Sequence, residues 1–506
     1  MAAALRANVK LPSFFSDHAV LQRDKPLPIW GWADPGEEVT VSLGTQTARG
    51  TAGRDGKWMV SLKGQPATGK AVDLTVSGKN TLTLRNILLG DVWLCSGQSN
   101  MEMGLGNCDA PDDIAAAAFP LIRHFRGQYN FAIAPAKDLQ GQWAVCEPGA
   151  APGFSAVGFY FARRIHQETG VPIGLLTNAV GGTNIELWMS QETLLNHPAL
   201  ESYASIMRES LTDYRKQLTA ALPEIENWTR QSRLALQAGQ AVPLMPAMPD
   251  FPFIDKISRP RCVTLHNGML APLVPMALKG VLWYQGENNA DGHLYVEKKA
   301  AMIADWRKWF RDPVLPFYYV QLAAWQPPHP DPAGGEWGMI RDAQRRCLSI
   351  PHTGMASAVD LGDAVDIHPK NKADVGERLA LWAMRNEYGK SQLQTSGPLF
   401  REMKIDGSKA RILFDHSGGV LMTARKQGRK PVEETPDAPL KQFAIAGEDG
   451  VWHWAEAEID GDTVVVSSPQ VVKPVAVRYA YRSNPEGANL YNSAGLPASP
   501  FRTDAW

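Results

Sequence analysis

Apolar and polar positions divide the chain into three parts. In the first and last parts apolar residues alternate with polar ones, for example at 39–43 and 410–414, which is typical of half-buried β-strands. In the middle part short apolar runs alternate with segments of helical spacing. The pattern therefore predicts an N-terminal β-sandwich at 1–88, an α/β domain at 89–394 and a C-terminal β module at 395–506.

The middle part is predicted to form a parallel sheet with helices on both faces. Short apolar runs predict its buried strands at 91–95, 173–179, 280–284, 317–322 and 354–360. Helical spacing predicts helices at 157–165, 298–310 and 375–382. Strands that alternate with helices are typical of α/β folds, whose ligands bind at the carboxyl ends of the strands.

An insertion interrupts this alternation at about 200–260. Residues 201–240 have helical spacing, and five prolines from Pro243 to Pro260 then break the chain repeatedly. Two interpretations remain open for this segment. It is either a lid over a site or a surface excursion that only packs.

The charge balance excludes several classes of partner. Lys and Arg total 51 and Asp and Glu total 52, which gives a formal net charge of −1. A nucleic-acid-binding protein usually carries a basic surplus, and attraction to anionic lipid needs one too. No stretch offers the roughly 20 unbroken apolar residues of a membrane span. The sequence therefore predicts a folded protein that binds neither nucleic acid nor membranes.

Cysteine and tryptophan usage leaves alternatives open. None of the five cysteines has the spacing of a zinc site, so no metal is predicted, and one disulfide of unspecified pairing remains open. The sixteen tryptophans fit either large cores or surfaces on which sugars stack. The first six residues lack the apolar core of a signal peptide, as expected of a chain from which a leader has been removed.

A serine follows the first strand of the middle part. Residues 95–101 are Cys-Ser-Gly-Gln-Ser-Asn-Met, which places Ser99 in a turn where a helix begins and where its own N–H can face a developing oxyanion. The motif differs from the G-x-S-x-G of α/β-hydrolases, because Met101 stands where that motif needs glycine. A lone Gly-x-Ser usually marks only a turn. Whether Ser99 is interpreted as a nucleophile therefore depends on the residues at the other strand ends.

Three further strand ends carry groups suited to acyl transfer. Gly181 and Gly182 let backbone amides approach a ligand, and the amide groups at 283–289 offer donors for an oxyanion. Asp366 and His368 suit the carboxylate and base of a Ser–His–Asp triad. Each also has a plain alternative, namely a turn, a capped loop or, for the last pair, a metal site whose third ligand is not evident. In chain order, they predict a nucleophile, then donors, then an acid–base pair.

Taken together, these motifs resemble the sialate O-acetylesterase family of SGNH (GDSL-like) hydrolases. The resemblance rests on residues 97–101, 181–183, 283–287 and 366–369, and it extends to 11–23 and 479–492. It implies a flavodoxin-like SGNH hydrolase domain between the two β modules. It also implies an esterase that needs no cofactor or metal.

The resemblance assigns a catalytic triad. Ser99 is expected to be the nucleophile and His368 the base and then the acid. Asp366 is expected to orient the imidazole, with Asp363 as second choice. SGNH enzymes more often place this Asp three residues before the His, and Val365 stands there in this chain.

The resemblance also implies groups that bind the oxyanion and the substrate. The expected oxyanion donors are the amides of Ser99 and Gly182 and the side chain of Gln285, which we favour over Asn288. Asn288 stands where the general SGNH pattern has its asparagine. Candidate substrate contacts are His266, Asn267, Trp283, Glu287 and Asn288.

The predicted substrate is an acetylated carbohydrate. The β modules and the tryptophans favour hemicellulose, such as xyloglucan or xylan. A sialate 9-O-acetylesterase is the alternative, and it would need a cation for the sugar carboxylate; the candidates are Arg163, Arg164, Arg261 and Arg341. A non-catalytic glycan-binding protein and a lipase or thioesterase are further alternatives. The resemblance implies a secreted or periplasmic location, and the sequence predicts no oligomeric state.

Overall fold

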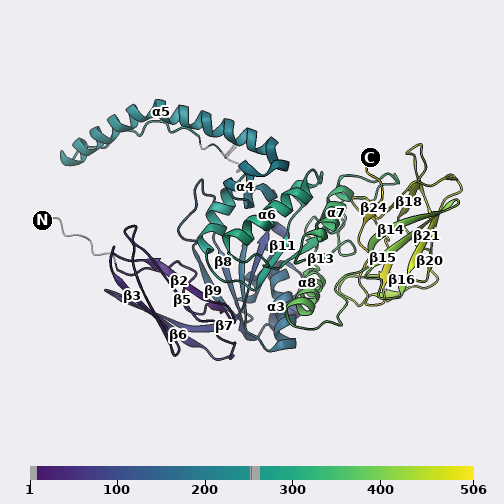
Figure 1. Cartoon of the computed structure of the whole chain (residues 1–506), viewed down its shortest axis with the longest axis horizontal. Coiled ribbons are helices and arrows are strands. Elements are labelled where there is room, and N and C mark those ends of the chain that lie inside the picture. The colour runs from purple at the N-terminus through teal and green to yellow at the C-terminus, as the bar shows by residue number, and fades with distance from the viewer. Residues whose placement is uncertain (1–7, 251, 253–261) are drawn as a thin grey trace.

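The computed structural model describes residues 8–250, 252 and 262–506. The start of the chain and Arg261, a candidate contact for a sugar carboxylate, lie outside these residues. Figure 1 shows three parts in a row. The N-terminal strands lie at one end, the helices and sheet of the middle part follow, and the C-terminal strands lie at the other end.

The middle part is built on a mixed sheet. In spatial order its strands are β13, β12, β11, β7, β10, β8 and β9. Their bounds, in the same order, are Thr353–Ser357, Phe317–Gln321, Gly280–Tyr284, Thr81–Gly97, Ile173–Ala179, Phe119–Gly127 and Gly141–Cys146. All neighbours are parallel except β8 and β9. The predicted parallel strands are therefore present, and β8 and β9 extend the sheet at an edge where the pattern predicted none.

Three strand ends meet at the middle of this sheet. The register pairs Gly97 of β7 with Ala179 of β10 on one side and with Tyr284 of β11 on the other. Because the three strands are parallel, the chain leaves all of them at the same edge. The motifs that follow these strands, predicted to carry the nucleophile and the donors, are thereby brought side by side.

Helices cover both faces of the sheet (Figure 1). On one face α3 (Ala156–Thr169) packs against α8 (Lys372–Glu387). On the other face α6 (Tyr295–Trp309) lies beside α7 (Glu336–Arg346). The short helices are α1 (Ser99–Glu102), α2 (Pro111–Ala115) and α4 (Gln191–Asn196).

Capping residues define the ends of α3 and α8, the two helices that share a face of the sheet. The Ser155 hydroxyl accepts the N–H of Gly158 at the start of α3, and Gly170 ends the helix in the left-handed conformation. Asn371 caps the start of α8 by accepting the N–H of Asp374. The cap of α8 also ends the loop that carries His368.

The N-terminal module is continuous with the middle part. Strand β7 pairs first with β6 of the module and then with β10 and β11 of the central sheet. The predicted boundary at residue 88 therefore falls inside one strand, and residues on both sides of it share one hydrophobic core. The other strands of the module are β1 (Val20–Gln22), β2 (Leu27–Trp32), β3 (Glu38–Leu43), β4 (Gln46–Thr51), β5 (Lys57–Leu62) and β6 (Val72–Ser77).

The C-terminal module has its own hydrophobic core. Its sheets have the strand orders β14-β15-β21-β20, β17-β16-β23 and β19-β18-β22-β24. The bounds are β14 Leu399–Asp406, β15 Lys409–Asp415, β16 Leu421–Arg425, β17 Glu433–Glu434, β18 Phe443–Ala446, β19 Trp452–Trp454, β20 Glu456–Asp460, β21 Thr463–Ser467, β22 Ala476–Tyr479, β23 Leu490–Asn492 and β24 Phe501–Arg502. All their pairings are antiparallel, as the alternating pattern predicts.

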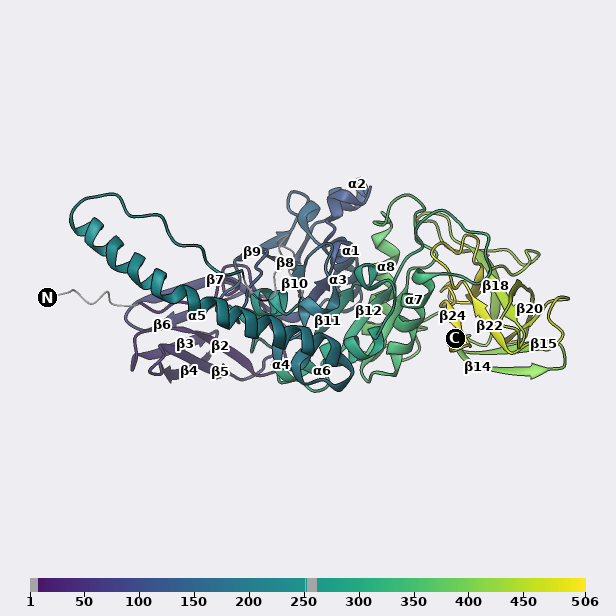
Figure 2. The ribbon, with the colours of Figure 1, turned by 90° about the horizontal axis from the view of Figure 1, so that it is seen from above.

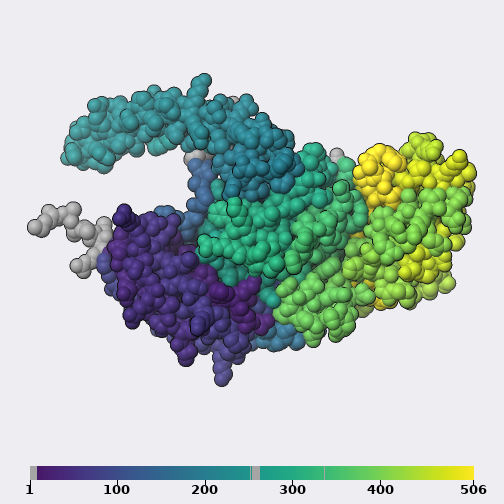
Figure 3. All heavy atoms as spheres, in the orientation of Figure 1, coloured from purple at the N-terminus to yellow at the C-terminus, as the bar shows by residue number. Residues whose placement is uncertain are grey.

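The insertion forms a long helix that leaves the body of the protein. Helix α5 spans Glu201–Gln237, close to the predicted 201–240, and its buried residues are Ala204, Met207 and Ser232. Figures 2 and 3 show this helix extending over the N-terminal module, with open space beside much of its length. The described part of the insertion is therefore a surface excursion.

Cysteine and many tryptophan side chains lie in the cores. The buried cysteines Cys95, Cys108, Cys146 and Cys347 are free thiols, so no disulfide joins any of these four. The fully buried tryptophans are Trp93, Trp188, Trp283 and Trp306, which favours the interpretation of tryptophan as core material. Among the described helices, none has both the length and the apolar character needed to cross a membrane.

Candidate active site

Ser99 is placed by the sharp turn at the end of β7. Gly97 has φ +129°, and a Cβ on it would lie 2.1 Å from the Tyr284 carbonyl oxygen, so only glycine fits between β7 and β11 here. The chain then turns into α1, of which Ser99 is the first residue. The N–H of a first-turn residue has no acceptor within its own helix. The Ser99 amide is therefore available to a ligand.

His368 lies against Ser99 although 269 residues separate them. The imidazole Nε2 is 2.8 Å from Ser99 Oγ, which is hydrogen-bond distance for the transfer of the serine proton. On the other side of the ring, Nδ1 is 3.4 Å from Asp366 Oδ1. The same oxygen accepts the backbone N–H of His368 at 2.8 Å. The geometry is that of a serine, histidine and carboxylate in series.

The surroundings of Asp366 keep it ionised. The hydrogen bond from the His368 backbone N–H is the main cause that lowers the Asp366 pKa, and the nearby charge of Lys370 adds to it. Asp363, the second choice, instead accepts the backbone N–H groups of Val365 and Asp366 at 2.8 and 3.3 Å. Asp363 thus shapes the turn, and Asp366 faces the imidazole.

The glycine loop after β10 lies directly beside the serine. A Cβ on Gly181 would lie 3.2 Å from Ser99 Cβ. The Gly181 N–H donates to Glu102 Oε2 at 3.0 Å, which holds the loop against α1. Gly182 has φ +69°, and within the described residues its N–H has no acceptor. The amides of Ser99 and Gly182 are therefore both available near the serine hydroxyl.

The structure contradicts the predicted oxyanion role of Gln285. Its side chain is fully buried, and its Nε2 donates to the Thr183 carbonyl at 3.2 Å and to Asn289 Oδ1 at 2.7 Å. Both amide protons are thus already bonded inside the protein. Asn288 is exposed instead, and its Nδ2 donates to the Gly182 carbonyl at 2.9 Å, which leaves its second amide proton for a ligand beside Gly182.

Most of the predicted substrate contacts lie elsewhere. His266 and Trp283 are fully buried, and Asn267 is 4% exposed. Trp283 packs edge-on against two other tryptophans, and His266 packs against Trp309. These predictions are wrong, because the residues pack in the core and none of them lines the pocket at Ser99. Glu287 turns inward, where its Oε1 accepts an N–H of Asn100.

An open pocket of about 420 Å³ surrounds the serine. Its lining includes Ser99, His368 and Asp366, and it adds two cations that sequence reasoning missed, Arg126 and Lys370. Arg126 comes from β8, which pairs with the edge strand β9. The apolar pattern did not predict β8, and a prediction of this strand would have pointed to Arg126. No described residue of the insertion lines this pocket, so the described structure does not support the lid interpretation.

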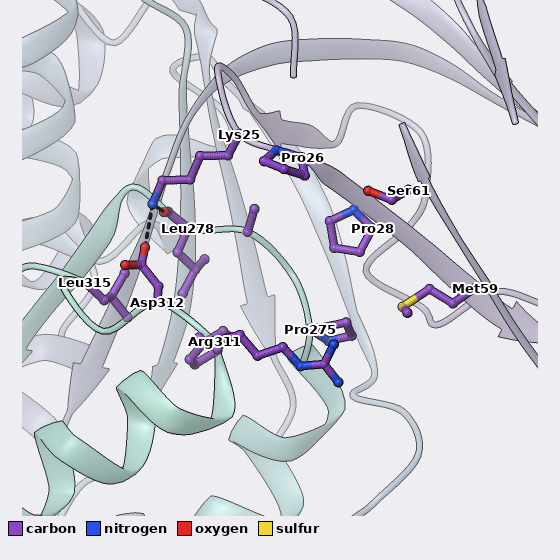
Figure 4. A pocket seen from close by; sticks show the side chains of 12 residues that line it. Lys25, Pro26, Pro28, Met59, Ser61, Pro275, Leu278, Arg311, Asp312 and Leu315 are labelled. Carbon is purple, nitrogen blue, oxygen red and sulfur yellow. Dashed lines mark hydrogen bonds and ion pairs between the residues drawn. The ribbon is translucent and has the colours of Figure 1, made fainter. Parts of the chain in front are cut away.

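A second cavity, of about 340 Å³, lies at the joint between the N-terminal module and the central sheet (Figure 4). Its walls include Pro28 and Pro275, and Lys25 Nζ at its side donates to the Leu278 carbonyl and to Asp312, each at 2.7 Å. Leu278 and Asp312 precede β11 and β12, so this cavity lies at the amino ends of the strands. Ligands of parallel sheets bind at the opposite edge, where Ser99 is.

Comparison with known proteins identifies the family. The family model described as "Carbohydrate esterase, sialic acid-specific acetylesterase" matches residues 89–222 and 262–385. The chain belongs to this family. It is therefore an enzyme, a carboxylic ester hydrolase of the carbohydrate O-acetylesterase class, and the alternative of a non-catalytic glycan-binding protein is set aside.

The similarity of the esterase to other members spans almost its whole length. A carbohydrate acetylesterase from Xanthomonas citri is 36% identical, with a TM-score of 0.81, and the match covers 98% of this chain and 100% of that one. The sialate O-acetylesterases of Rattus norvegicus and Homo sapiens are each 28% identical over 97% of this chain and over 94% and 92% of theirs. The β modules are thus part of the similarity as well.

Replacing the carboxylate that faces the imidazole tests the triad geometry. We expect Asp366→Asn in the esterase to lower kcat by about 10³- to 10⁴-fold, because a neutral amide no longer fixes the tautomer or stabilises the imidazolium. Asp363→Asn is the matched control, since an amide oxygen still accepts the two backbone N–H groups of the turn. Hydrolysis of a small acetyl ester measures both. An equal loss in the two variants would contradict this geometry.

Proposed function

We propose that the esterase removes O-acetyl groups from sugars through an acetyl-enzyme formed on Ser99. The observation that carries the proposal is the 2.8 Å contact between His368 Nε2 and Ser99 Oγ. The spatial order β10-β7-β11-β12-β13 supports a flavodoxin-like SGNH domain, since numbering these strands along the chain gives the order 2-1-3-4-5.

The proposed reaction has two half-reactions. In the first, Ser99 Oγ attacks the acetyl carbonyl carbon while His368 takes the serine proton. The bond from this carbon to the sugar oxygen then breaks, and His368 gives the proton to that oxygen. In the second half-reaction, water attacks the acetyl-enzyme and gives a proton to His368. The ester bond to Ser99 breaks, the serine regains the proton, and acetate leaves.

We assign the oxyanion to three donors beside Ser99. The amides of Ser99 and Gly182 have no acceptor within the described part of the chain. Asn288 Nδ2 is fixed next to Gly182 by its bond to the Gly182 carbonyl. Preorganised donors of this kind stabilise charge that develops only in the transition state, which raises kcat rather than substrate affinity.

We propose a neutral acetylated hemicellulose, such as xyloglucan or xylan, as the substrate. Both cations of the pocket already have an anionic neighbour, because Arg126 lies 3.0 Å from Glu102 and Lys370 lies 3.8 Å from Asp366. A sugar carboxylate would have to compete with these partners. Tyr129, 55% exposed, also donates its hydroxyl proton to Glu102, so an exposed aromatic ring stands near the pocket. Such an exposed ring can stack against the pyranose ring of a sugar substrate.

The sialate alternative rests on the description of the family model and on the names of two relatives. Three of the four arginines predicted to bind a sialate carboxylate lie in the described structure, and each of them is engaged elsewhere. Arg163 pairs with Asp113 at 2.6 Å, and Arg164 pairs with Glu168 and Glu377. Arg341 is fully buried and donates to backbone carbonyls. Among the described residues, Arg126 and Lys370 are the cations of the pocket that a sialate carboxylate could meet.

The oxyanion assignment predicts different effects for the two candidate amides. We expect Asn288→Ala to lower kcat by about 10²-fold with little change in KM, because one transition-state donor is lost. Gln285→Met keeps the side-chain volume but removes the buried amide. It should lower thermal stability while kcat of the folded enzyme changes less than tenfold. The reverse ranking in steady-state kinetics would return the oxyanion role to Gln285.

Acetate release distinguishes the two substrate classes. The enzyme is incubated with acetylated xyloglucan oligosaccharides, acetylated xylan and 9-O-acetylated sialic acid, with Ser99→Ala as the blank. We expect release from a hemicellulose in clear excess over the sialic acid. Release from sialic acid alone, with a KM that rises in Arg126→Gln or Lys370→Gln, would overturn the hemicellulose proposal. Equal release by the Ser99→Ala variant would overturn the nucleophile.

A further inference from the structure

Hydrogen bonds from two buried side chains hold the His368 loop, one on each side of the histidine. The Nδ2 of Asn100 donates to the carbonyl of Ile367 at 3.1 Å. The Nζ of Lys372 donates to the carbonyl of Pro369 at 2.8 Å. Ile367 and Pro369 are the neighbours of His368 in the chain. The peptide groups on both sides of the histidine are therefore fixed by protein donors.

These two side chains are also bonded to each other and to a carboxylate. Lys372 Nζ donates to Asn100 Oδ1 at 2.5 Å, and Asn100 Nδ2 donates to Glu287 Oε1 at 2.6 Å. Asn100 is 2% exposed and Lys372 is fully buried. Asn100 is the residue after Ser99, so the same amide group belongs to the helix that carries the nucleophile. We call Asn100, Lys372 and Glu287 the Asn100 bracket.

The bracket places a positive and a negative group on opposite sides of one amide. Burial lowers the pKa of Lys372 to about 8 and raises the pKa of Glu287. Removing one of two buried partner charges usually costs far more than removing both, because the remaining charge is left without compensation. The free energy of unfolding should therefore depend on the balance between Lys372 and Glu287.

The bracket lies behind the reacting groups. None of its three residues lines the pocket at Ser99. Glu287 was predicted to contact substrate, yet its Oε1 is bonded to Asn100, and its Oε2 is buried with no partner among the described residues. A sugar in the pocket would meet Ser99 and His368, not these side chains.

We propose that Asn100, Lys372 and Glu287 are positioning residues that set the distance between Ser99 and His368. This inference rests on the proposed catalytic roles of those two residues. The bracket joins the backbone beside the nucleophile to the backbone beside the base, across segments that are far apart in the chain. Without it, the His368 loop is tied to α1 mainly through the catalytic hydrogen bond itself. A misplacement of about 1 Å between reacting groups costs on the order of 10²-fold in rate.

The test separates the effect on rate from the effect on stability. We expect Lys372→Met to lower kcat about 10- to 100-fold, with KM within twofold, and to lower the melting temperature. Adding Glu287→Gln removes the uncompensated charge, and its amide oxygen still accepts from Asn100. The melting temperature of the double variant should rise back toward that of the wild type. Its kcat should stay low, because the Pro369 carbonyl still lacks its hydrogen bond from Lys372. If kcat recovers together with stability, Lys372 has a structural role only and the proposal fails.

Lys299→Met provides the matched control. Lys299 is likewise fully buried, and its Nζ has no hydrogen-bond partner within the described residues; it lies over the Tyr319 ring, apart from the His368 loop. We expect this variant to change stability but to leave kcat within threefold. A loss of kcat as large as that of Lys372→Met would overturn the proposal.

Two substrates distinguish positioning from substrate contact. The variants are assayed with p-nitrophenyl acetate, which contains no sugar, and with the acetylated sugar that the wild type hydrolyses. Positioning predicts the same fold loss on both esters, and Asn100→Ala should follow Lys372→Met on both. A loss confined to the sugar would make the bracket a substrate contact instead. If wild type itself shows no Ser99-dependent hydrolysis of either ester, the proposed function fails, whatever the bracket does.

Discussion

The short contact between the Ser99 hydroxyl and the His368 imidazole constrains the fold most tightly, because it requires the two loops that carry these residues to be held in a fixed relative position. The two side chains meet at 2.8 Å, but they are 269 positions apart in the chain. A hydrogen bond of this length tolerates little movement. The sheet supplies the coarse placement, because β7 and β13 deliver both loops to the same edge. The bonds of Asn100 and Lys372 then fix the backbone on both sides of His368 and link it to the residue after Ser99.

Glycines make room for this arrangement at the strand ends. Gly97 lets β7 and β11 approach so closely that a side chain would meet the Tyr284 carbonyl. Gly181 brings the next loop against Ser99, and Glu102 holds it there through the Gly181 N–H. Among the described residues, the Gly182 N–H has no acceptor. Gln285 follows Tyr284 in the chain and lies in the interior, where its amide bonds to Thr183 and Asn289.

Local patterns predict much of this structure, and the misses have physical causes. Strands β10 and β11, the long helix α5, and the motifs of Ser99, Asp366 and His368 follow from spacing over a few residues. The direction in which a side chain points does not follow from such local spacing. Whether an amide such as Gln285 points to solvent or to the core depends on partners far away in the chain. The pairing of Arg126 with Glu102, which balances the pocket's charge, depends on β8, a strand next to the edge of the sheet with a weak apolar pattern.

Identifying the residue that carries the acetyl group tests the central claim most directly. The wild type is mixed with p-nitrophenyl acetate, whose good leaving group makes the first half-reaction fast, quenched in acid and analysed by peptide mass spectrometry. We expect one acetyl group on Ser99, formed at the rate of the initial burst and lost with the later turnover. An acetyl group on another residue, or steady turnover without any modification of Ser99, would contradict it.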